Sequence, residues 1–151
     1  MAASENPLSV GLLPFREEGE DGYFMLSLSP RVRAPEGEVV PKDVVFILDR
    51  SGSMEEGGKM AQARAALSYC LKALAPQDRF GIVDFATDAA SLDSRLLTAT
   101  PANRARALRY VERLEASGGT NIEESLDEGM RLINAEPQAG RVPMVFFMTD
   151  G

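Results

Sequence analysis

The sequence predicts an α/β protein with a doubly wound, mostly parallel sheet that is flanked by helices. Two unbroken apolar runs, Val44–Leu48 and Val142–Met148, are typical of strands buried on both faces of a parallel sheet. Segments with the helical spacing of apolar residues alternate with such runs along the chain. Each of the two runs is followed by an aspartate, Asp49 or Asp150, near the end of the expected strand.

Composition supports a folded domain and excludes several classes of function. The chain has 151 residues, of which 44% are hydrophobic and 26% are charged. Its 16 basic and 23 acidic residues give a net charge of −7, so we expect no contact of this segment with nucleic acid or membrane. The chain has no histidine, which excludes Ser-His-Asp triads and histidine metal ligation within it. Cys70 is expected to be a small core residue.

The first part of the chain predicts a β-hairpin and a connector. The apolar runs Leu8–Phe15 and Tyr23–Ser29 flank residues 16–22, which form an acidic segment with two glycines. Residues 30–42 carry three prolines, which favours an extended connector over a helix or strand. No signal peptide or membrane span is recognisable in the chain, so its sequence alone assigns no location.

The elements that follow the first buried strand alternate between helix and strand. They are a helix over Gly58–Ala75, a strand over Phe80–Phe85, a short polar strand over Leu92–Thr98, and helices over Ala102–Glu115 and Thr120–Ala135. The helical spacing of the last segment runs through Ile122, Leu126, Met130 and Ile133. This alternation is the pattern of an α/β sheet.

Oxygen-bearing side chains gather where the strands are expected to end. Asp49, Ser51 and Ser53 form a D-x-S-x-S pattern after the first buried strand, Thr120 lies in a glycine-rich segment, and Asp150 follows the last strand. Ligands of parallel sheets bind beyond the carboxyl ends of the strands. Two carboxylates and three hydroxyls suit a hard cation such as Mg²⁺, and the lack of nitrogen and sulfur donors argues against zinc.

Both of the hydroxyl positions that precede helices have a simpler interpretation. Ser53 with Glu56, and Thr120 with Glu123, fit the S/T-x-x-E capping box, in which the hydroxyl only starts a helix. For each pair taken alone, capping and metal binding are equally good interpretations. The convergence of all the oxygen ligands on one edge of the sheet favours the metal site.

Two other motifs are excluded by single residues. The segment from Ser53 to Lys59 resembles a damaged phosphate-binding loop, but Met60 stands where the Mg²⁺-binding hydroxyl belongs. The segment that starts at Asp49 resembles the beginning of an EF-hand, but Met54 stands at the position that requires glycine.

Three separated motifs together resemble the von Willebrand factor type A domain with its metal-ion-dependent adhesion site. They are Val44–Met54 (VVFILDRSGSM), Gly118–Ile122 (GGTNI) and Val145–Gly151 (VFFMTDG). The resemblance implies a Rossmann-like fold and Mg²⁺ or Mn²⁺ as the bound ion. It also implies that the ligands of that ion are Asp49, Ser51, Ser53, Thr120 and Asp150. The two aspartates would bind it largely through water. A carboxylate from a protein partner would complete the coordination shell, and Thr120 would bind the ion directly in that state.

The upstream residues are similar to proteins that combine a VIT domain with a type A domain, such as the inter-alpha-trypsin inhibitor heavy chains. That similarity implies a hairpin and linker over residues 1–41, following a missing VIT-like domain, and the first part of a type A domain over residues 42–151. Members of the family continue past the T-D-G motif, so we expect this chain to be a fragment. Extracellular, periplasmic and cell-surface locations all fit such a parent protein.

The resemblance implies a non-enzymatic, metal-dependent adhesion or protein-binding module. Arg50, which is unusual between the first two metal ligands, is expected to point away from the ion. One alternative is a subunit of a chelatase-like or chaperone-like assembly that lends its metal site to an ATPase. A second is a metal-dependent phosphohydrolase with Asp49 as nucleophile, which is disfavoured because Ser51 stands where such enzymes carry their second acid.

Overall fold

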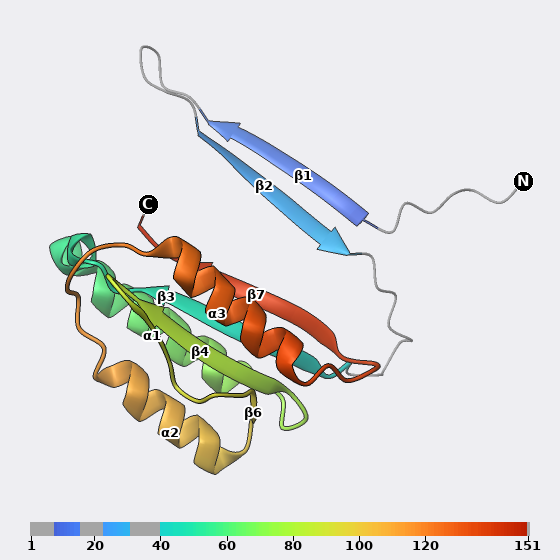
Figure 1. The fold of residues 1–151 in the computed structure, drawn as a ribbon. Coiled ribbons are helices and arrows are strands. Elements are labelled where there is room, and N and C mark those ends of the chain that lie inside the picture. The colour runs from blue at the N-terminus through green and yellow to red at the C-terminus, as the bar shows by residue number, and fades with distance from the viewer. Residues whose placement is uncertain (1–7, 16–22, 31–39, 151) are drawn as a thin grey trace, which may run out of the picture. The chain divides into compact units, whose positions relative to one another are not determined.

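A computed structural model describes residues 8–15, 23–30 and 40–150 of the chain (Figure 1). The chain forms two compact units, Met1–Val39 and Val40–Gly151. In the first unit, β1 (Leu8–Phe15) pairs with β2 (Tyr23–Pro30) as an antiparallel hairpin with Leu8 opposite Pro30. The predicted hairpin is therefore confirmed, whereas the predicted segment 16–22 and most of the predicted connector 30–42 lie outside the described residues.

The second unit alternates strands and helices as predicted. Its elements are β3 (Lys42–Asp49), the 3-10 helix η1 (Gly52–Gly58), α1 (Lys59–Ala73), β4 (Arg79–Phe85), β5 (Ala89–Ser91), β6 (Leu97–Thr98), α2 (Pro101–Glu112), α3 (Ile122–Ala135) and β7 (Val142–Met148).

The sheet of the second unit is built around β3. Its strand order is β5-β4-β3-β7, and β6 pairs with β4 as well. β3 runs parallel to both of its neighbours, while the short strands β5 and β6 are antiparallel to β4. The prediction of a mostly parallel sheet is therefore confirmed, and β7 lies beside β3.

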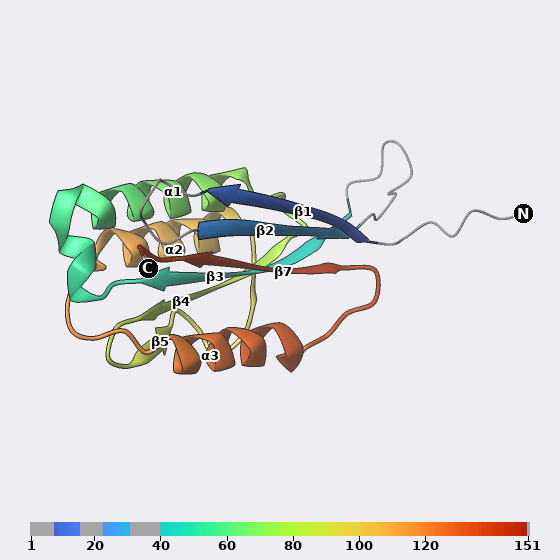
Figure 2. The ribbon, with the colours of Figure 1, turned by 90° about the horizontal axis from the view of Figure 1, so that it is seen from above.

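Helices cover both faces of this sheet, as Figure 2 shows, with α1 and α2 on one side and α3 on the other. Side chains of β3 alternate between the two cores. Val44, Phe46 and Leu48 pack in the core with α1 and α2, and Val45 and Ile47 pack in the core with α3. All five are at most 2% exposed, which explains why the strand reads as an unbroken apolar run.

One predicted strand is wrong in its extent. Instead of a single strand over Leu92–Thr98, the chain forms β5 and β6 with bends between them. Arg106 occupies this interruption, because its Nη1 donates to Asp93 at 2.8 Å and its Nη2 donates to the carbonyl of Leu92 at 3.0 Å.

The orientation of α3 also differs from the prediction. Of its predicted apolar positions only Ile133 is buried, while Ile122, Leu126 and Met130 are 43%, 42% and 51% exposed. The helix instead approaches the sheet through Gly129, where an added Cβ would lie 2.7 Å from Cδ1 of Ile47. The small residue permits close helix–sheet contact, which a count of large apolar residues does not detect.

A buried ionic cluster holds the amino ends of the central strands. Arg79 Nε and Arg141 Nε donate to Oδ1 of Asp43 at 2.8 and 2.6 Å, and Asp43 is 5% exposed. Burial raises the pKa of the Asp43 carboxyl, but the hydrogen bonds and charges of the two arginines outweigh it and hold that pKa below its ordinary value. Asp43 therefore links β3 to β4 and to the residue that precedes β7.

Replacing Asp43 with asparagine is expected to lower the free energy of unfolding by about 3 kcal/mol at pH 7, because two largely buried arginines lose their counter-charge. The native pKa is lowered, so this contribution is complete above the unfolded pKa of about 4 and is lost as the pH falls through the native pKa. Urea unfolding of both proteins between pH 7 and pH 3 tests this. The difference should narrow below about pH 4, and a constant difference would contradict the assignment. Asp127→Asn, on the exposed surface of α3, is the control.

Candidate metal centre

The carboxyl ends of β3, β4 and β7 meet at one edge of the sheet (Figure 2). Asp49 is the last residue of β3, and Asp150 comes two residues after the end of β7. The parallel register places Leu48 beside Met148, so the segments that follow the two strands leave the sheet side by side. The topology thus brings together two acids that are far apart in the sequence.

Asp49 is fully buried, and both of its carboxylate oxygens are engaged. Oδ1 accepts a hydrogen bond from the backbone N–H of Ser51 at 2.8 Å, and Oδ2 accepts one from Oγ1 of Thr149 at 2.7 Å. Within the described residues no basic side chain forms an ion pair with this carboxylate. Within the described part of the chain, the hydrogen bonds to this carboxylate come from a backbone N–H and a hydroxyl, which are both neutral groups.

A chain of hydrogen bonds joins the two serines to Asp150. The hydroxyls of Ser51 and Ser53 are 3.1 Å apart, and Oγ of Ser53 donates to Oδ1 of Asp150 at 3.0 Å. Four of the five predicted ligands are therefore brought together, namely Asp49, Ser51, Ser53 and Asp150. Carboxylate and hydroxyl oxygens are hard donors, the kind of ligand that Mg²⁺ prefers.

Lys59, the first residue of α1, adds a positive charge to this cluster. Its ammonium group donates to Oδ2 of Asp150 at 2.7 Å and to the carbonyl of Ser53 at 3.3 Å. The hydrogen bond raises the pKa of Lys59 and lowers the pKa of Asp150. Sequence reasoning considered this lysine only as part of a damaged phosphate-binding loop. The overlooked signal is a cation at the start of a helix, where acidic residues are favoured.

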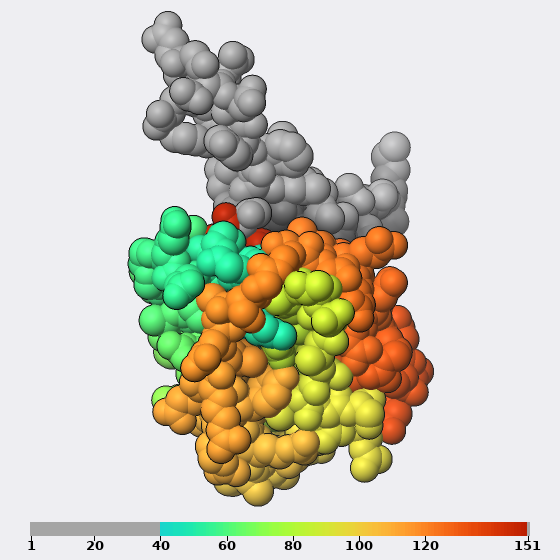
Figure 3. Space-filling model, turned by 60° about the vertical axis from the view of Figure 1, so that its left-hand side comes forward, coloured from blue at the N-terminus to red at the C-terminus, as the bar shows by residue number. Residues whose placement is uncertain are grey.

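Thr120, the fifth predicted ligand, lies on a loop that is held against the D-x-S-x-S segment. Gly52 N donates to the carbonyl of Gly118 at 3.1 Å, and Figure 3 shows the segment with η1 beside the loop that leads to α3. Thr120 itself is exposed and lines a surface hollow with Thr87 and Asn121. Among the described residues, no hydrogen bond joins Thr120 to the other four ligands.

The capping interpretations of the two hydroxyls are wrong. The N-cap of α3 is Asn121, whose side chain accepts a hydrogen bond from Glu124 N at 3.2 Å, so Thr120 is left outside the helix. The N-cap of α1 is Gly58 in the left-handed conformation, and Ser53 lies within η1. Neither predicted ligand is therefore occupied in starting a helix.

Arg50 extends to Asp84 and Ser117. Its Nε donates to Oδ2 of Asp84 at 2.6 Å, and its Nη1 donates to Oγ of Ser117 at 3.0 Å. Tyr110 donates to the other oxygen of Asp84, and burial together with that hydrogen bond raises the pKa of Tyr110. Sequence reasoning did not identify Asp84 as a partner, although an aspartate within an apolar strand is the signal of a buried ion pair.

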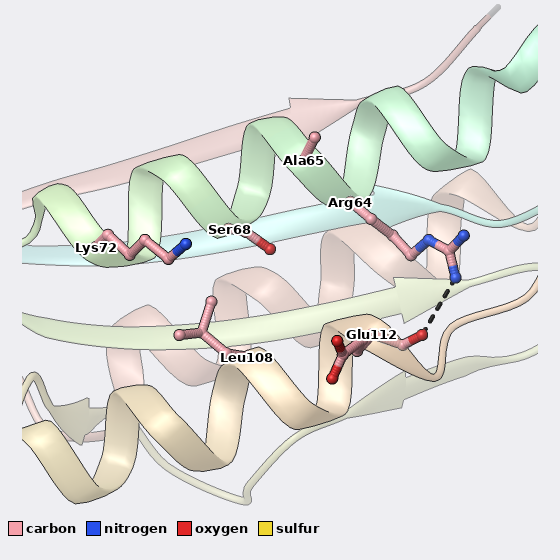
Figure 4. A pocket seen from close by; sticks show the side chains of 6 residues that line it. All are labelled: Arg64, Ala65, Ser68, Lys72, Leu108 and Glu112. Atoms are coloured by element: carbon pink, nitrogen blue, oxygen red, sulfur yellow. Dashed lines mark hydrogen bonds between the residues drawn. The ribbon is translucent and has the colours of Figure 1, made fainter.

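A hollow of about 320 Å³ between α1 and α2 is separate from this cluster (Figure 4). Its lining is mixed polar and apolar and includes Arg64, whose Nη1 donates to the carbonyl of Glu112 at 3.1 Å. None of the predicted ligands lines it. Across the described ranges, no helix is long and apolar enough to cross a membrane.

Comparison with known proteins assigns the family. Residues 44–151 match the von Willebrand factor type A domain. The chain belongs to this family. The chain is also 36% identical over 137 residues to the mouse (Mus musculus) protein named inter alpha-trypsin inhibitor, heavy chain 4. That match covers 87% of this chain but 14% of the mouse protein, so the chain spans a small part of its relative's length.

Solved structures share the fold of this type A domain. A von Willebrand factor type A structure from Catenulispora acidiphila has a TM-score of 0.63 at 24% identity and covers 91% of this chain and 32% of its own. The vWF domain of the type V pili tip protein Mfa5 from Porphyromonas gingivalis has a TM-score of 0.64 at 20% identity, with coverages of 76% and 39%. The predicted Rossmann-like type A architecture is therefore confirmed.

The conformation of the loop that carries Thr120 depends on Gly118. A substitution at Gly118 therefore tests whether this loop takes part in metal binding by the type A domain. Gly118 has φ +76°, and a methyl group there would lie 2.8 Å from Oγ1 of Thr87. Gly118→Ala is expected to cost at least about 1–2 kcal/mol of stability and to weaken Mg²⁺ binding by displacing the loop. Gly140→Ala is the matched control, because Gly140 has φ +79° with open space around it.

Calorimetric titration with Mg²⁺ and urea unfolding of both variants provide the measurements. Gly140→Ala should lose stability and keep its Mg²⁺ affinity. Equal Mg²⁺ affinities for Gly118→Ala and Gly140→Ala would show that this loop takes no part in metal binding.

Proposed function

We propose that this type A domain is a metal-dependent protein-binding module. The observation that carries the proposal is the chain of oxygen donors from Asp49 through Ser51 and Ser53 to Asp150, where the ends of β3 and β7 meet. The proposed ion is Mg²⁺ or Mn²⁺, held by these four residues and by Thr120. The bound ion would supply a positive charge that attracts an anionic group of a partner.

The chemistry of the donors fits a hard divalent cation. Within the described residues, no three His, Cys, Asp or Glu side chains group to hold a metal, so hydroxyls have to complete any site here. Mg²⁺ accepts such a set, because it binds oxygen and keeps several water molecules.

The proposed partner is a protein that offers a carboxylate to the metal. With Asp49 and Asp150 acting largely through water, the protein groups that bind the ion directly would be neutral hydroxyls. The ion would then keep a positive charge that an acidic side chain of a partner can approach. Thr120 is exposed on the loop beside the cluster, from where we expect it to bind the ion directly once a partner is present. The family match and the likeness to a pili tip protein support an interaction role.

The proposed domain organisation follows from the same similarity. Residues 42–151 belong to the type A domain, and residues 1–41, which include β1 and β2, belong to a separate segment that precedes it. Support comes from the division into two compact units at Val39 and from the family match, which begins at residue 44.

We also propose that the domain is not an enzyme. Ser51 stands where a phosphohydrolase would need its acid, and its hydroxyl is 3.1 Å from that of Ser53. A role in a chelatase-like ATPase assembly would use the same metal site, and the similarity to the inter-alpha-trypsin inhibitor heavy chains favours the adhesion role over it.

Replacing Asp49 with asparagine should weaken Mg²⁺ and Mn²⁺ binding by about tenfold or more, judged from the 10–100-fold cost of losing groups around a metal. Asparagine keeps the shape of the side chain and can accept the hydrogen bond from Ser51 N, so the fold should survive. Calorimetric titration of wild type, Asp49→Asn and Asp127→Asn gives the answer. Asp127 is an exposed acid on α3, so its variant removes the same charge away from the cluster. Equal affinity in all three proteins would refute the metal site.

The non-enzymatic assignment has its own test. With saturating Mg²⁺, the 151-residue chain should not release phosphate from p-nitrophenyl phosphate above the background rate. Turnover that disappears in Asp49→Asn would instead establish the phosphohydrolase alternative.

A further inference from the structure

Lys59 occupies a position that the proposed metal site does not explain. Its side chain is 42% exposed and ends on Asp150, whose side chain is 12% exposed. The ammonium donates to Oδ2 of Asp150 at 2.7 Å, and the hydroxyl of Ser53 donates to Oδ1 of the same carboxylate at 3.0 Å. Both oxygens of Asp150 are therefore engaged by groups of the chain itself.

The place of Lys59 in α1 is electrostatically unfavourable without a partner. Lys59 is the first residue of this helix, and the first turn carries no acidic residue. A helix N-terminus bears a partial positive charge, so a cation at this position is repelled by the backbone. Its ion pair with Asp150 offsets that repulsion and holds the side chain over the cluster.

A divalent ion and this ammonium would depend on the same acid. Besides Asp150, the cluster offers the carboxylate of Asp49, for which the described residues provide no basic side chain as an ion-pair partner. An ion bound among Asp49, Ser51 and Ser53 would therefore meet a carboxylate already neutralised by Lys59, and it would also be repelled by the ammonium.

We infer that Lys59 is an internal counter-ion that competes with the metal for Asp150 and thereby limits metal affinity. The inference rests on the proposed metal site. Lys59 neutralises Asp150, which also accepts the hydrogen bond from Ser53. Metal binding then requires the ammonium to move away from Asp150.

The test compares Lys59→Gln with Lys72→Gln and Lys59→Arg by calorimetric titration with Mg²⁺. Lys72 lies in the last turn of the same helix, so its variant removes an equal charge away from the cluster. Lys59→Gln should bind Mg²⁺ about two- to fivefold more tightly than wild type, the range that corresponds to an exposed ion pair. Lys72→Gln and Lys59→Arg should stay within the error of wild type.

A second measurement separates competition from a purely structural role. Thermal unfolding in a chelator should show Lys59→Gln to be less stable than wild type, because Asp150 loses its counter-ion. The same variant should gain more stability from saturating Mg²⁺ than wild type does. A structural role alone predicts the first change without tighter Mg²⁺ binding.

The outcomes distinguish this inference from the proposed function. If wild type binds Mg²⁺ and Lys59→Gln binds it equally or more weakly, the competition is refuted and the metal site stands. If neither protein binds Mg²⁺, the proposed metal site fails and the inference fails with it. If Lys59→Gln binds Mg²⁺ tightly and wild type does not, the result would support both the proposed metal site and the competition by Lys59.

Discussion

The candidate site depends on the position of β3 between two parallel neighbours. Because β4 and β7 run in the same direction as β3, all three strands end at one edge of the sheet. Asp49 is the last residue of β3 and is fully buried there, yet its carboxylate contacts both the loop at Ser51 and Thr149 beyond β7. A strand order that separated β3 from β7 would separate these groups, and the oxygen cluster would not form.

The acidic residues at the two ends of the sheet differ in how many basic side chains contact them. At the amino ends, Asp43 is matched by Arg79 and Arg141, so the chain itself supplies the charge that a buried carboxylate requires. At the carboxyl ends, the ion pair found among the described residues joins Lys59 to Asp150 and does not include Asp49. The first arrangement is closed and structural, whereas at the second the proposed metal ion would supply the positive charge.

The loops around the candidate site are held in place by contacts within the chain. Arg50 lies between two predicted ligands in sequence, but its side chain extends to Asp84 and Ser117. It thereby fixes the D-x-S-x-S segment against β4 and against the loop that carries Thr120. Groups positioned in this way lose little further freedom when a ligand binds, which favours affinity.

The sequence by itself determined the class of fold, the central strands and the candidate ligands, because burial on both faces and short motifs leave strong local patterns. It failed where the outcome depended on distant residues. Arg106 binds the segment between β5 and β6 where a single strand was predicted over Leu92–Thr98, and Gly129 sets how closely α3 approaches the sheet. Only the tertiary structure decided that Lys59 reaches Asp150, 91 positions away, because no local pattern encodes a charge pair made by the parallel pairing of distant strands.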